Sequence, residues 1–494
     1  MAAIEAGLAE APDRAELLFE RAALFDALGE AERAEAAYLE LLHRAPAHPG
    51  ALINLGSLLR RRGSLSAARL SYAEAVARHP RLTAGHVNLA HLLHQAGETE
   101  GARQHYEAAL TLDPALAEAH QGLANLFDDL GETAAAERHR ERGWRGHALV
   151  KRPYRGAGPP VRLLLIISAA GGNIPTTFIL DDRIFAVTVL AAEFFDPALP
   201  LPPHDVVLNA IGDADRCRTA LACAEQILAR SEAPQVNAPV RVRATGRLET
   251  AATLGAIPGL VVPPIALVPR SEIAGPGVEA RLLARGFEFP LLLRTPGFHT
   301  GRHFLRLGTA SELAGAMATL PGENQYVIKS LEARSEDGLY RKYRVMFIDG
   351  HPFPLHLAIS RHWKVHYFTA GMAADASFRA EEARFLADMP RVLGRCGMGV
   401  LASIRERLGL DYAGIDFTLG PTGKVLLFEA NPAMAIVPPD ADPRWNYRRR
   451  AVGKALAAVR RVLVERAARS GSRPTGNAGS SQADTAAASI RSNM

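Results

Sequence analysis

Two carboxylates and one amide near the C-terminal end of the chain, Asp416, Glu429 and Asn431, have the spacing of groups that meet across a β-hairpin. They lie in two apolar, strand-like segments. The sequence Gly-Pro-Thr-Gly between those segments is typical of a tight turn, centred between Thr422 and Gly423. With the turn at that point, Asp416 lies opposite Glu429, and the two-residue period of a strand places Asn431 on the same face.

Like charges directly across a strand pair are unfavourable unless a positive charge offsets them. Carboxylate and amide oxygens suit Mg²⁺ or Mn²⁺ better than zinc, and an ion shared with nucleotide phosphates needs only one or two protein carboxylates. The other hairpin residues, Ile415, Phe417, Phe428 and Ala430, are expected on the opposite face, in the core. We therefore predict a magnesium or manganese site. The alternative is a solvent-facing hairpin with ordinary surface acids.

The hairpin resembles the last metal-binding hairpin of ATP-grasp enzymes, which carries Asp on one strand and Glu-x-Asn on the next. The positions that match are Asp416, Glu429 and Asn431. The resemblance extends over most of the chain from residue 235 to about residue 465. It implies an α+β ATP-grasp fold, ATP as a ligand, and magnesium ions that bridge the ATP phosphates.

Two arginines stand where most members of that family carry lysine. Arg247 lies in a predicted helix, and Arg294 ends a strand that leads into a loop with Gly297 and Gly301. Such a loop can close its backbone N–H groups over phosphates. Arginine keeps the charge, but its reach and geometry differ from those of lysine. The resemblance assigns these four residues to ATP binding; for Arg294 the alternative is a structural salt bridge.

Further positions follow from the same resemblance. The apolar strand with Gln325, Tyr326 and Val327 aligns with the segment whose backbone pairs with adenine in relatives. Arg344 lies on the first strand of a hairpin with an Asp-Gly turn, and Arg361 arrives at the end of the second. Both match family positions that contact the γ-phosphate or the acyl-phosphate, so they are the expected catalytic residues.

Cations on a sheet that is otherwise buried need an anionic partner. Lys342 projects from the same face as Arg344, and the metal hairpin with ATP would supply that partner. For Lys342 and its neighbour Arg341, surface solvation is favoured over a role at the site. Four residues lie where relatives shape the acceptor pocket: Trp363, Lys364, His366 and Tyr367.

Residues 1–146 form a repeat array with a period of 34 residues, the period of tetratricopeptide repeats. A glycine ends the first helix of each unit, a small alanine lets the paired helices approach, and a proline closes the second helix. About four units would stack into an all-α solenoid of the kind that binds a peptide or a protein. The repeated positions are Gly29, Gly63, Gly97 and Gly131; Ala34, Ala68, Ala102 and Ala136; Tyr38, Tyr72 and Tyr106; Pro46, Pro80 and Pro114.

The fourth unit departs from this pattern. Arg140 replaces the tyrosine and Ala148 replaces the proline, so this unit is expected to cap the array or to dock on the next domain of the chain. His86 and His120 share one repeat position, and packing inside the helix pair is favoured over ligand binding.

A linker is expected over residues 147–160, because that segment is rich in proline and glycine. Residues 161–240 then alternate strands with helix-sized segments, which favours a parallel α/β sheet. This part resembles the small domain that precedes the ATP-binding half of ATP-grasp enzymes. The ATP-grasp domain is expected over residues 241–468, followed by a disordered tail over residues 469–494, which is poor in large apolar residues.

Composition narrows the function classes. The net charge of +5 comes without a basic run that has interleaved aromatics, so nucleic acid is not an expected partner. Three cysteines among 494 residues match no zinc spacing and favour a reduced compartment. No signal peptide or membrane span is predicted, and we expect a cytoplasmic protein.

The resulting hypothesis is a multidomain ATP- and Mg²⁺-dependent ligase that joins a carboxylate to an amine through an acyl-phosphate, with repeats that recruit a protein or peptide. The closest resemblance is to enzymes that add amino acids to peptides or ribosomal proteins. One alternative is a nucleotide-binding adaptor that no longer catalyses, motivated by the two lysine-to-arginine changes. Another is a kinase-like phosphotransferase on the same fold.

Overall fold

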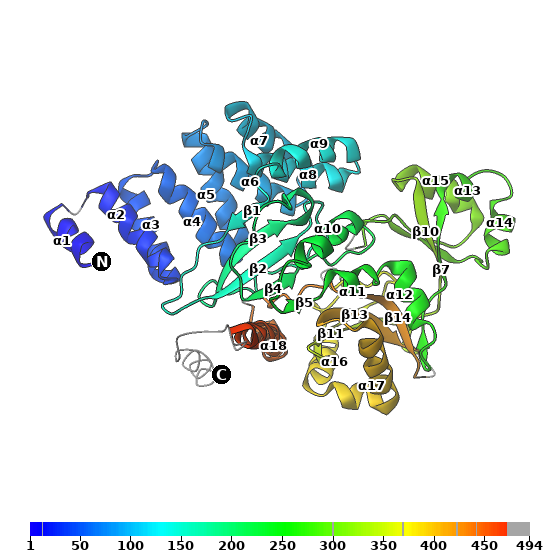
Figure 1. Ribbon diagram of the computed structural model, residues 1–494. Coiled ribbons are helices and arrows are strands. Elements are labelled where there is room, and N and C mark those ends of the chain that lie inside the picture. The colour runs from blue at the N-terminus through cyan, green and yellow to red at the C-terminus, as the bar shows by residue number, and fades with distance from the viewer. Residues whose placement is uncertain (12, 299–300, 368–369, 421–422, 441, 472–494) are drawn as a thin grey trace. The chain divides into compact units, whose positions relative to one another are not determined.

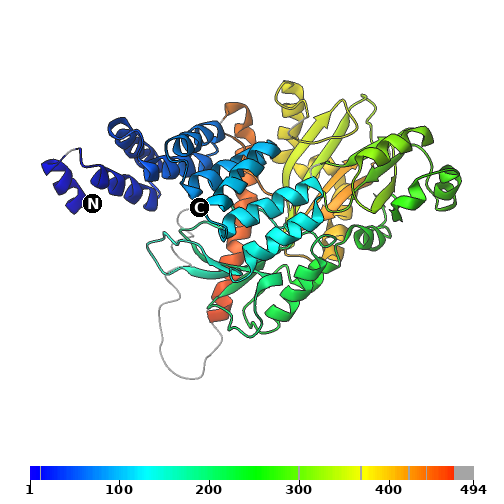
Figure 2. The same cartoon turned by 90° about the horizontal axis from the view of Figure 1, so that it is seen from above.

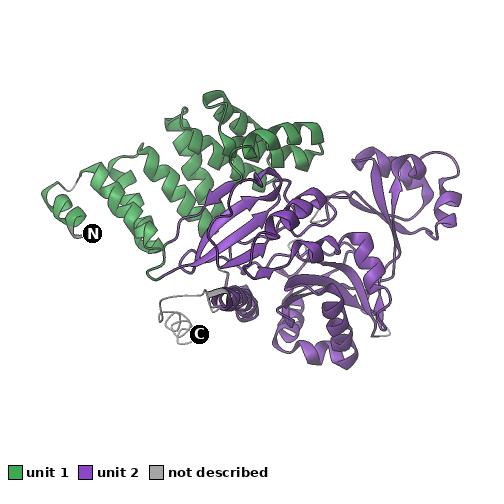
Figure 3. Ribbon diagram, in the orientation of Figure 1, with its two compact units in different colours: residues 1–148, 155–158 green, residues 149–154, 159–494 purple. Residues whose placement is uncertain are grey.

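The chain folds into two compact units in the computed structural model, and each is considered by itself (Figure 3). Unit 1 comprises residues 1–148 and 155–158, and unit 2 comprises residues 149–154 and 159–494. The structure describes all residues except 12, 299–300, 368–369, 421–422, 441 and 472–494. The predicted turn residue Thr422 and most of the predicted tail therefore lie outside the described residues.

Unit 1 is an array of antiparallel helices in which each helix packs on its neighbours (Figure 1). The glycines at the 34-residue period have left-handed φ values of 70° to 82°, which reverse the chain between the two helices of a pair. The helices are α1 (Ala2–Glu10), α2 (Ala15–Ala27), α3 (Ala31–Arg44), α4 (Pro49–Arg61), α5 (Leu65–Arg78), α6 (Thr83–Gln95), α7 (Thr99–Leu112), α8 (Ala117–Leu130) and α9 (Thr133–Trp144).

The repeated alanines and tyrosines form the core of the array. Tyr38, Tyr72 and Tyr106 are fully buried, as are the four alanines that start the same pattern. In the last pair of helices, Arg140 takes the place of the tyrosine and is also buried. Its guanidinium donates to Asp128 at 2.6 Å and to Glu137, so ion pairs replace an aromatic contact at this end of the array.

The first sheet of unit 2 has the strand order β1-β3-β2-β4-β5. Strand β2 (Val161–Ile167) opens the segment for which a parallel α/β sheet was expected, and it pairs in parallel with β3 (Phe185–Ala191) and β4 (Val206–Asn209). β5 (Gln235–Val236) extends the parallel part. The helices α10 (Arg218–Leu228) and η1 (Ala192–Phe194) accompany this sheet.

The predicted linker needs one correction. Residues Leu149–Lys151 form β1, which pairs antiparallel with β3 at the edge of the first sheet. Three exposed residues at a sheet edge bury nothing, so no hydrophobic pattern marks this strand in the sequence. Residues 155–158 return to unit 1, where the Arg155 guanidinium donates to the Asp26 carbonyl at 3.0 Å.

A second sheet has the order β7-β10-β8-β9 and is antiparallel throughout. It has a core of its own, which includes Val268, Leu293 and Val327. Figure 1 shows the helices of this part around the sheet. Its elements are β7 (Ile265–Pro269), α13 (Arg270–Ile273), α14 (Val278–Ala284), β8 (Leu291–Arg294), β9 (Phe304–Leu307), η2 (Ala310–Glu312), α15 (Leu313–Thr319) and β10 (Asn324–Lys329).

The third sheet has the order β12-β11-β13-β14-β6 and is antiparallel except for the β14–β6 pair. Helices α16 and α17 supply the core on one face, and α18, coloured orange to red in Figure 2, packs against the other. The elements are α11 (Pro239–Arg243), α12 (Arg247–Leu254), β6 (Leu260–Val261), β11 (Tyr340–Ile348), β12 (His351–Ser360), α16 (Ala376–Ala387), α17 (Met389–Leu408, kinked at Gly394), β13 (Tyr412–Leu419), β14 (Val425–Asn431), η3 (Pro443–Trp445) and α18 (Asn446–Gly471).

The domain boundary expected at residue 240 does not appear in the division of the chain into two units. The first and third sheets share one hydrophobic core with α18, and both lie in unit 2. Asn237 joins them further. Its side-chain oxygen accepts from the backbone N–H groups of Asp411 and Tyr412, and its amide donates to the Tyr412 carbonyl at 2.7 Å. Unit 2 is therefore an α/β region with mixed sheets.

Candidate functional site

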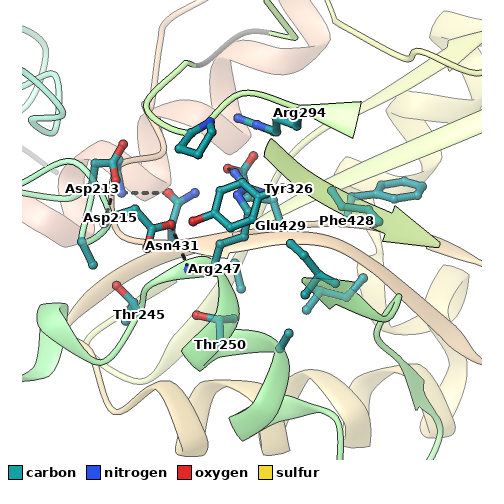
Figure 4. Close-up of a pocket in the computed structure, with 18 of the residues that line it drawn as sticks. Asp213, Asp215, Thr245, Arg247, Thr250, Arg294, Tyr326, Phe428, Glu429 and Asn431 are labelled. Atoms are coloured by element: carbon teal, nitrogen blue, oxygen red, sulfur yellow. Dashed lines mark hydrogen bonds and ion pairs between the residues drawn. The ribbon is translucent and has the colours of Figure 1, made fainter. Parts of the chain in front are cut away.

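A cavity open to solvent lies within unit 2 where residues of its three sheets come together (Figure 4). The loop after β4 contributes Asp213 and Asp215, and α12 contributes Arg247 and Thr250. The second sheet contributes Arg294 and Tyr326, and β14 contributes Glu429 and Asn431. Segments far apart in the sequence thus direct charged side chains into one space.

Six of the predicted site residues line this cavity: Arg247, Arg294, Gly297, Tyr326, Glu429 and Asn431. The other six do not. Gln325, Val327 and Asp416 are buried beneath the surface, Arg344 is bound to Asp416, and Arg361 is exposed after the end of β12. Gly301, in the loop after β8, lies close to the Lys364 side chain. Residues 299–300 of the same predicted loop lie outside the described residues.

Arg247 and Glu429 form an ion pair at the floor of the cavity, with an Nη2–Oε1 distance of 2.7 Å. Burial would lower the pKa of Arg247, but the carboxylate more than offsets this, so the group stays charged. Arg294 lies at the opposite wall and donates to the Phe298 carbonyl at 2.7 Å. Burial, together with the charge of Arg247, lowers the pKa of Arg294. Two arginines that repel one another across a cavity favour an anionic ligand between them.

A row of polar side chains crosses the third sheet from β12 to β14. The strand registers pair His356 with Arg344, Arg344 with Asp416, and Asp416 with Glu429. Directly opposed residues share one face of a sheet, so these four side chains lie on one face, and the Glu429–Arg247 pair extends the row. The predicted opposition of Asp416 and Glu429 is therefore confirmed by the register.

Asp416 is held entirely by cations of the protein. The Arg344 guanidinium donates to both carboxylate oxygens at 2.7 Å, and the Lys342 ammonium lies 3.1 Å from Oδ2. Burial alone would raise the pKa of Asp416, but Arg344 and Lys342 more than offset it and hold the pKa well below its usual range. The positive charge that two opposed acids require is thus supplied by side chains.

The predicted metal ligands fit an ion only in part. Glu429 and Asn431 line the cavity, and one carboxylate with one amide is enough for an ion shared with phosphates. Asp416 is shielded by its two cationic partners and does not line the cavity. Within the described part of the chain, no three His, Cys, Asp or Glu side chains are grouped so that they could hold a metal ion.

Phe428 corrects the predicted core face of the hairpin. The register of β13 and β14 shifts between Asp416 and Phe417, so that Phe417 lies opposite Leu427 and the ladder skips Phe428. Such a bulge turns the extra residue out of the alternating pattern. Phe428 is 38% exposed and lines the cavity, whereas Leu427, which also borders the cavity, is 3% exposed and packs in the core. Sequence alternation could not reveal this, because it assumes an uninterrupted ladder.

The predicted backbone contact to adenine also needs correction. β10 is paired on both edges, with β7 through residues 324–328 and with β8 through residues 326–329. A strand flanked on both sides has its ladder groups in use, so the backbone at Tyr326 and Val327 is not available to a ligand. The Gln325 side chain bonds to Thr295 and to the Pro321 carbonyl. Of the three predicted residues, Tyr326 lines the cavity, and Ile328 of the same strand lines it as well.

Asp213 and Asp215 were not among the predicted site residues. They follow β4 at the carboxyl end of a parallel strand, where ligand-binding loops of open α/β sheets usually lie. Asp215 accepts from the backbone N–H of Arg247 at 3.0 Å. Burial and Asp215 together raise the pKa of Tyr326, so its hydroxyl stays protonated. The sequence Asn-Ala-Ile-Gly-Asp-Ala-Asp after a predicted strand was the available signal.

Comparison with known proteins identifies the repeats. Residues 19–83 match a family model described as tetratricopeptide repeat, and residues 90–131 match one described as TPR repeat. The N-terminal region therefore consists of tetratricopeptide repeats, as predicted. No curated protein matches the chain.

Several solved structures resemble about a quarter of the chain. A tetratricopeptide repeat protein from Parabacteroides merdae is 30% identical over 26% of this chain and 51% of its own, with a TM-score of 0.25. MamA from Desulfovibrio magneticus is 20% identical over 28% of this chain and 77% of its own, with a TM-score of 0.26. PilF from Pseudomonas aeruginosa is 20% identical over 28% of this chain and 64% of its own, with a TM-score of 0.27.

Among the described helices, none combines the length and the apolarity needed to cross a membrane.

Proposed function

We propose that unit 2 is an ATP-dependent carboxylate–amine ligase of the ATP-grasp type, and that the tetratricopeptide repeats bind a protein or peptide partner. The observation that carries the proposal is the cavity in which Arg247, Arg294 and Glu429 converge beside the polar row of the third sheet. A site with this charge distribution suits a polyanionic ligand such as a nucleoside triphosphate. Phe428 and Tyr326 offer aromatic surface for a base in the same space.

In the proposed reaction, a substrate carboxylate accepts the γ-phosphoryl group of ATP, and the bond to ADP breaks. An amine then displaces phosphate from the acyl-phosphate and loses a proton, so the products are an amide, ADP and phosphate. A magnesium ion bound with the nucleotide would neutralise phosphate charge, and Glu429 and Asn431 are the residues that would hold it. Arg247 and Arg294, which line the cavity, would stabilise the charge that spreads over the transferred group, and Arg344 lies on the same sheet face, held by Asp416.

The repeats support the second half of the proposal. Stacked helix pairs expose a continuous surface that binds peptides or proteins in many such arrays. A protein or peptide would then be the partner or substrate that the array delivers to the ligase.

A nucleotide-binding adaptor remains the second candidate, and one observation favours it. Asp416 is neutralised by Lys342 and Arg344, which leaves one fewer carboxylate for metal binding than an active site of this type was expected to have. The two candidates differ in turnover. Release of ADP that depends on a particular amine or carboxylate supports the ligase, whereas ATP binding without ADP release from any substrate mixture supports the adaptor.

A further inference from the structure

Asp416 is paired with two cationic side chains, more positive charge than one carboxylate needs for neutrality. Its side chain is 4% exposed, and both of its oxygens accept from Arg344. Lys342 adds a second cation at 3.1 Å, with its own side chain 14% exposed. Lys342 and Arg344 are two residues apart on β11, so both project from the same face of the strand toward this carboxylate.

The excess of positive charge continues along the row. Glu429 is paired with Arg247. The described ion pairs of the row therefore contain three cations, Lys342, Arg344 and Arg247, and two carboxylates, Asp416 and Glu429. His356, opposite Arg344, contributes no negative charge, because an imidazole is either neutral or positive. A divalent ion placed at Asp416 would add two charges to a buried group that is already net positive. Such an ion would have to displace Lys342 from its carboxylate.

We infer that the Lys342 ammonium takes the place of a divalent ion at Asp416, so that this site binds nucleotide phosphates with one exchangeable metal ion, at Glu429 and Asn431, instead of two. Asp416 is then a positioning residue that holds Lys342 and Arg344 on the sheet face that carries Glu429. This inference rests on the proposed nucleotide site. It differs from the expectation drawn from the family resemblance, in which Asp416 itself holds magnesium.

The test counts manganese ions bound to the full-length protein in the presence of a non-hydrolysable ATP analogue, by electron paramagnetic resonance of free Mn²⁺. The wild-type protein should bind one Mn²⁺ per chain. Lys342→Met leaves Asp416 paired with Arg344, so the fold should persist, and its thermal midpoint verifies this. The variant should gain a second Mn²⁺ or bind manganese at least ~10-fold more tightly. Lys454→Met, which removes an exposed lysine of α18, is the matched control and should behave as wild type.

The same samples measure affinity for the analogue in EDTA. Loss of a fixed cation should weaken metal-free binding of the analogue about 10-fold in Lys342→Met and leave the control unchanged. Two Mn²⁺ in the wild-type protein, or an unchanged count and affinity in a folded Lys342→Met variant, would overturn the inference while leaving the nucleotide site intact. If the wild-type protein binds no analogue at all, the proposed function fails and the inference fails with it.

Discussion

Single residues of the site are arranged so that buried charges compensate one another. Arg344 and Lys342 neutralise Asp416, and Arg247 neutralises Glu429, before any ligand is added. Removing the cations from the buried Asp416 leaves its charge uncompensated, at a cost of about 3–5 kcal/mol. The Arg247–Glu429 pair is 20% and 24% exposed, and Arg247 also has Asp215 nearby, so loss of Glu429 should cost less. A ligand that carries several negative charges can bind beside these pairs without breaking them, because the pairs hold three cations and two carboxylates.

Phe428 gives a prediction at this scale. Because the bulge leaves the ring 38% exposed at the cavity, Phe428→Ala should weaken binding of an ATP analogue by about 10-fold, corresponding to the loss of one aromatic contact. The thermal midpoint should change little, because the ring is not part of the core. Isothermal titration calorimetry measures the affinity.

Phe178→Ala is the matched control, since Phe178 is 40% exposed and does not line the cavity. Equal losses of affinity in both variants, or none in Phe428→Ala, would show that the ring does not contact the nucleotide.

The sequence predicted the opposition of Asp416 and Glu429, but the register next to the turn is one residue away from the predicted one, with Phe417 opposite Leu427, and the bulge restores the predicted pairing at Asp416. It could not predict Phe428, because a one-residue bulge has no signature in an alternating pattern. It also could not predict that Lys342 binds Asp416. A lysine two positions from an arginine is equally compatible with solvent exposure until the strands are assembled.

At the scale of elements, adjacent repeats place the same side chains in the same surroundings. His86 Nδ1 lies 3.0 Å from His105 Nδ1, and one repeat later His120 Nδ1 lies 2.9 Å from His139 Nδ1. The other ring nitrogens of His86 and His120 lie within hydrogen-bond distance of the Pro80 and Pro114 carbonyls. In each pair the first histidine can therefore donate to the carbonyl and accept from the second histidine. The predicted packing role of His86 and His120 agrees with this arrangement.

These pairs should make the array sensitive to acid. Burial and His120 lower the pKa of His139 to about 4, with Arg142 and Arg138 adding to the effect and Glu107 opposing it; burial and His86 also lower the pKa of His105. The unfolded chain, with an ordinary histidine pKa of about 6.5, binds protons first as the pH falls. The stabilisation is therefore complete above about pH 6.5 and is lost as the pH falls toward 4.

The expected loss is on the order of 1–2 kcal/mol after allowance for partial exposure. Urea unfolding of the full chain, followed by circular dichroism at pH 7.5 and pH 5, measures it. In a His105→Gln/His139→Gln variant the pH dependence should shrink, whereas His147→Gln, at an exposed position, should retain it. The same pH dependence in all three proteins would contradict this account of the histidine pairs.

A second prediction at this scale concerns the contact between helices within the array. A Cβ atom at Gly122 would lie 2.2 Å from Cε1 of Tyr106, which is fully buried and cannot move aside. Gly122→Ala should therefore destabilise the chain by about 1–3 kcal/mol, although alanine is the better helix former.

Gly101→Ala is the control, because its nearest neighbour would be Leu93 Cδ1 at an ordinary 3.4 Å. It should be neutral or stabilise by up to ~1 kcal/mol. Loss of ellipticity at 222 nm with temperature compares the two, and a Gly122→Ala variant as stable as Gly101→Ala would refute the close contact.

A helix or strand could be predicted from the sequence where it buries apolar side chains in a regular pattern. β2 is recognisable because its apolar run is continuous, and the 34-residue glycine period identifies every helix pair of the array. β1 buries nothing and so leaves no pattern. The availability of the β10 backbone could not be judged from sequence either, since it depends on which strands flank it.

At the scale of the whole molecule, a repeat array and an α/β region with mixed sheets occupy one chain. The period of the repeats identified the array, and its family matches confirm it. The division inside unit 2 was harder to predict, because Asn237 and α18 join the first and third sheets into one core that a boundary at residue 240 would cut. The central claim concerns unit 2, namely that its charged cavity catalyses ATP-dependent ligation.

The most direct measurement is Mg²⁺-dependent ADP formation by the purified chain across a panel of amino acids and peptides, beside Glu429→Gln. Loss of the carboxylate that pairs with Arg247 and faces the cavity should reduce substrate-stimulated turnover at least ~100-fold while the thermal midpoint stays within a few degrees. Stimulation of ADP release by a particular carboxylate and amine, abolished in the variant, is the result this account predicts. ADP release from no mixture although ATP binds, or full activity in Glu429→Gln, would contradict it.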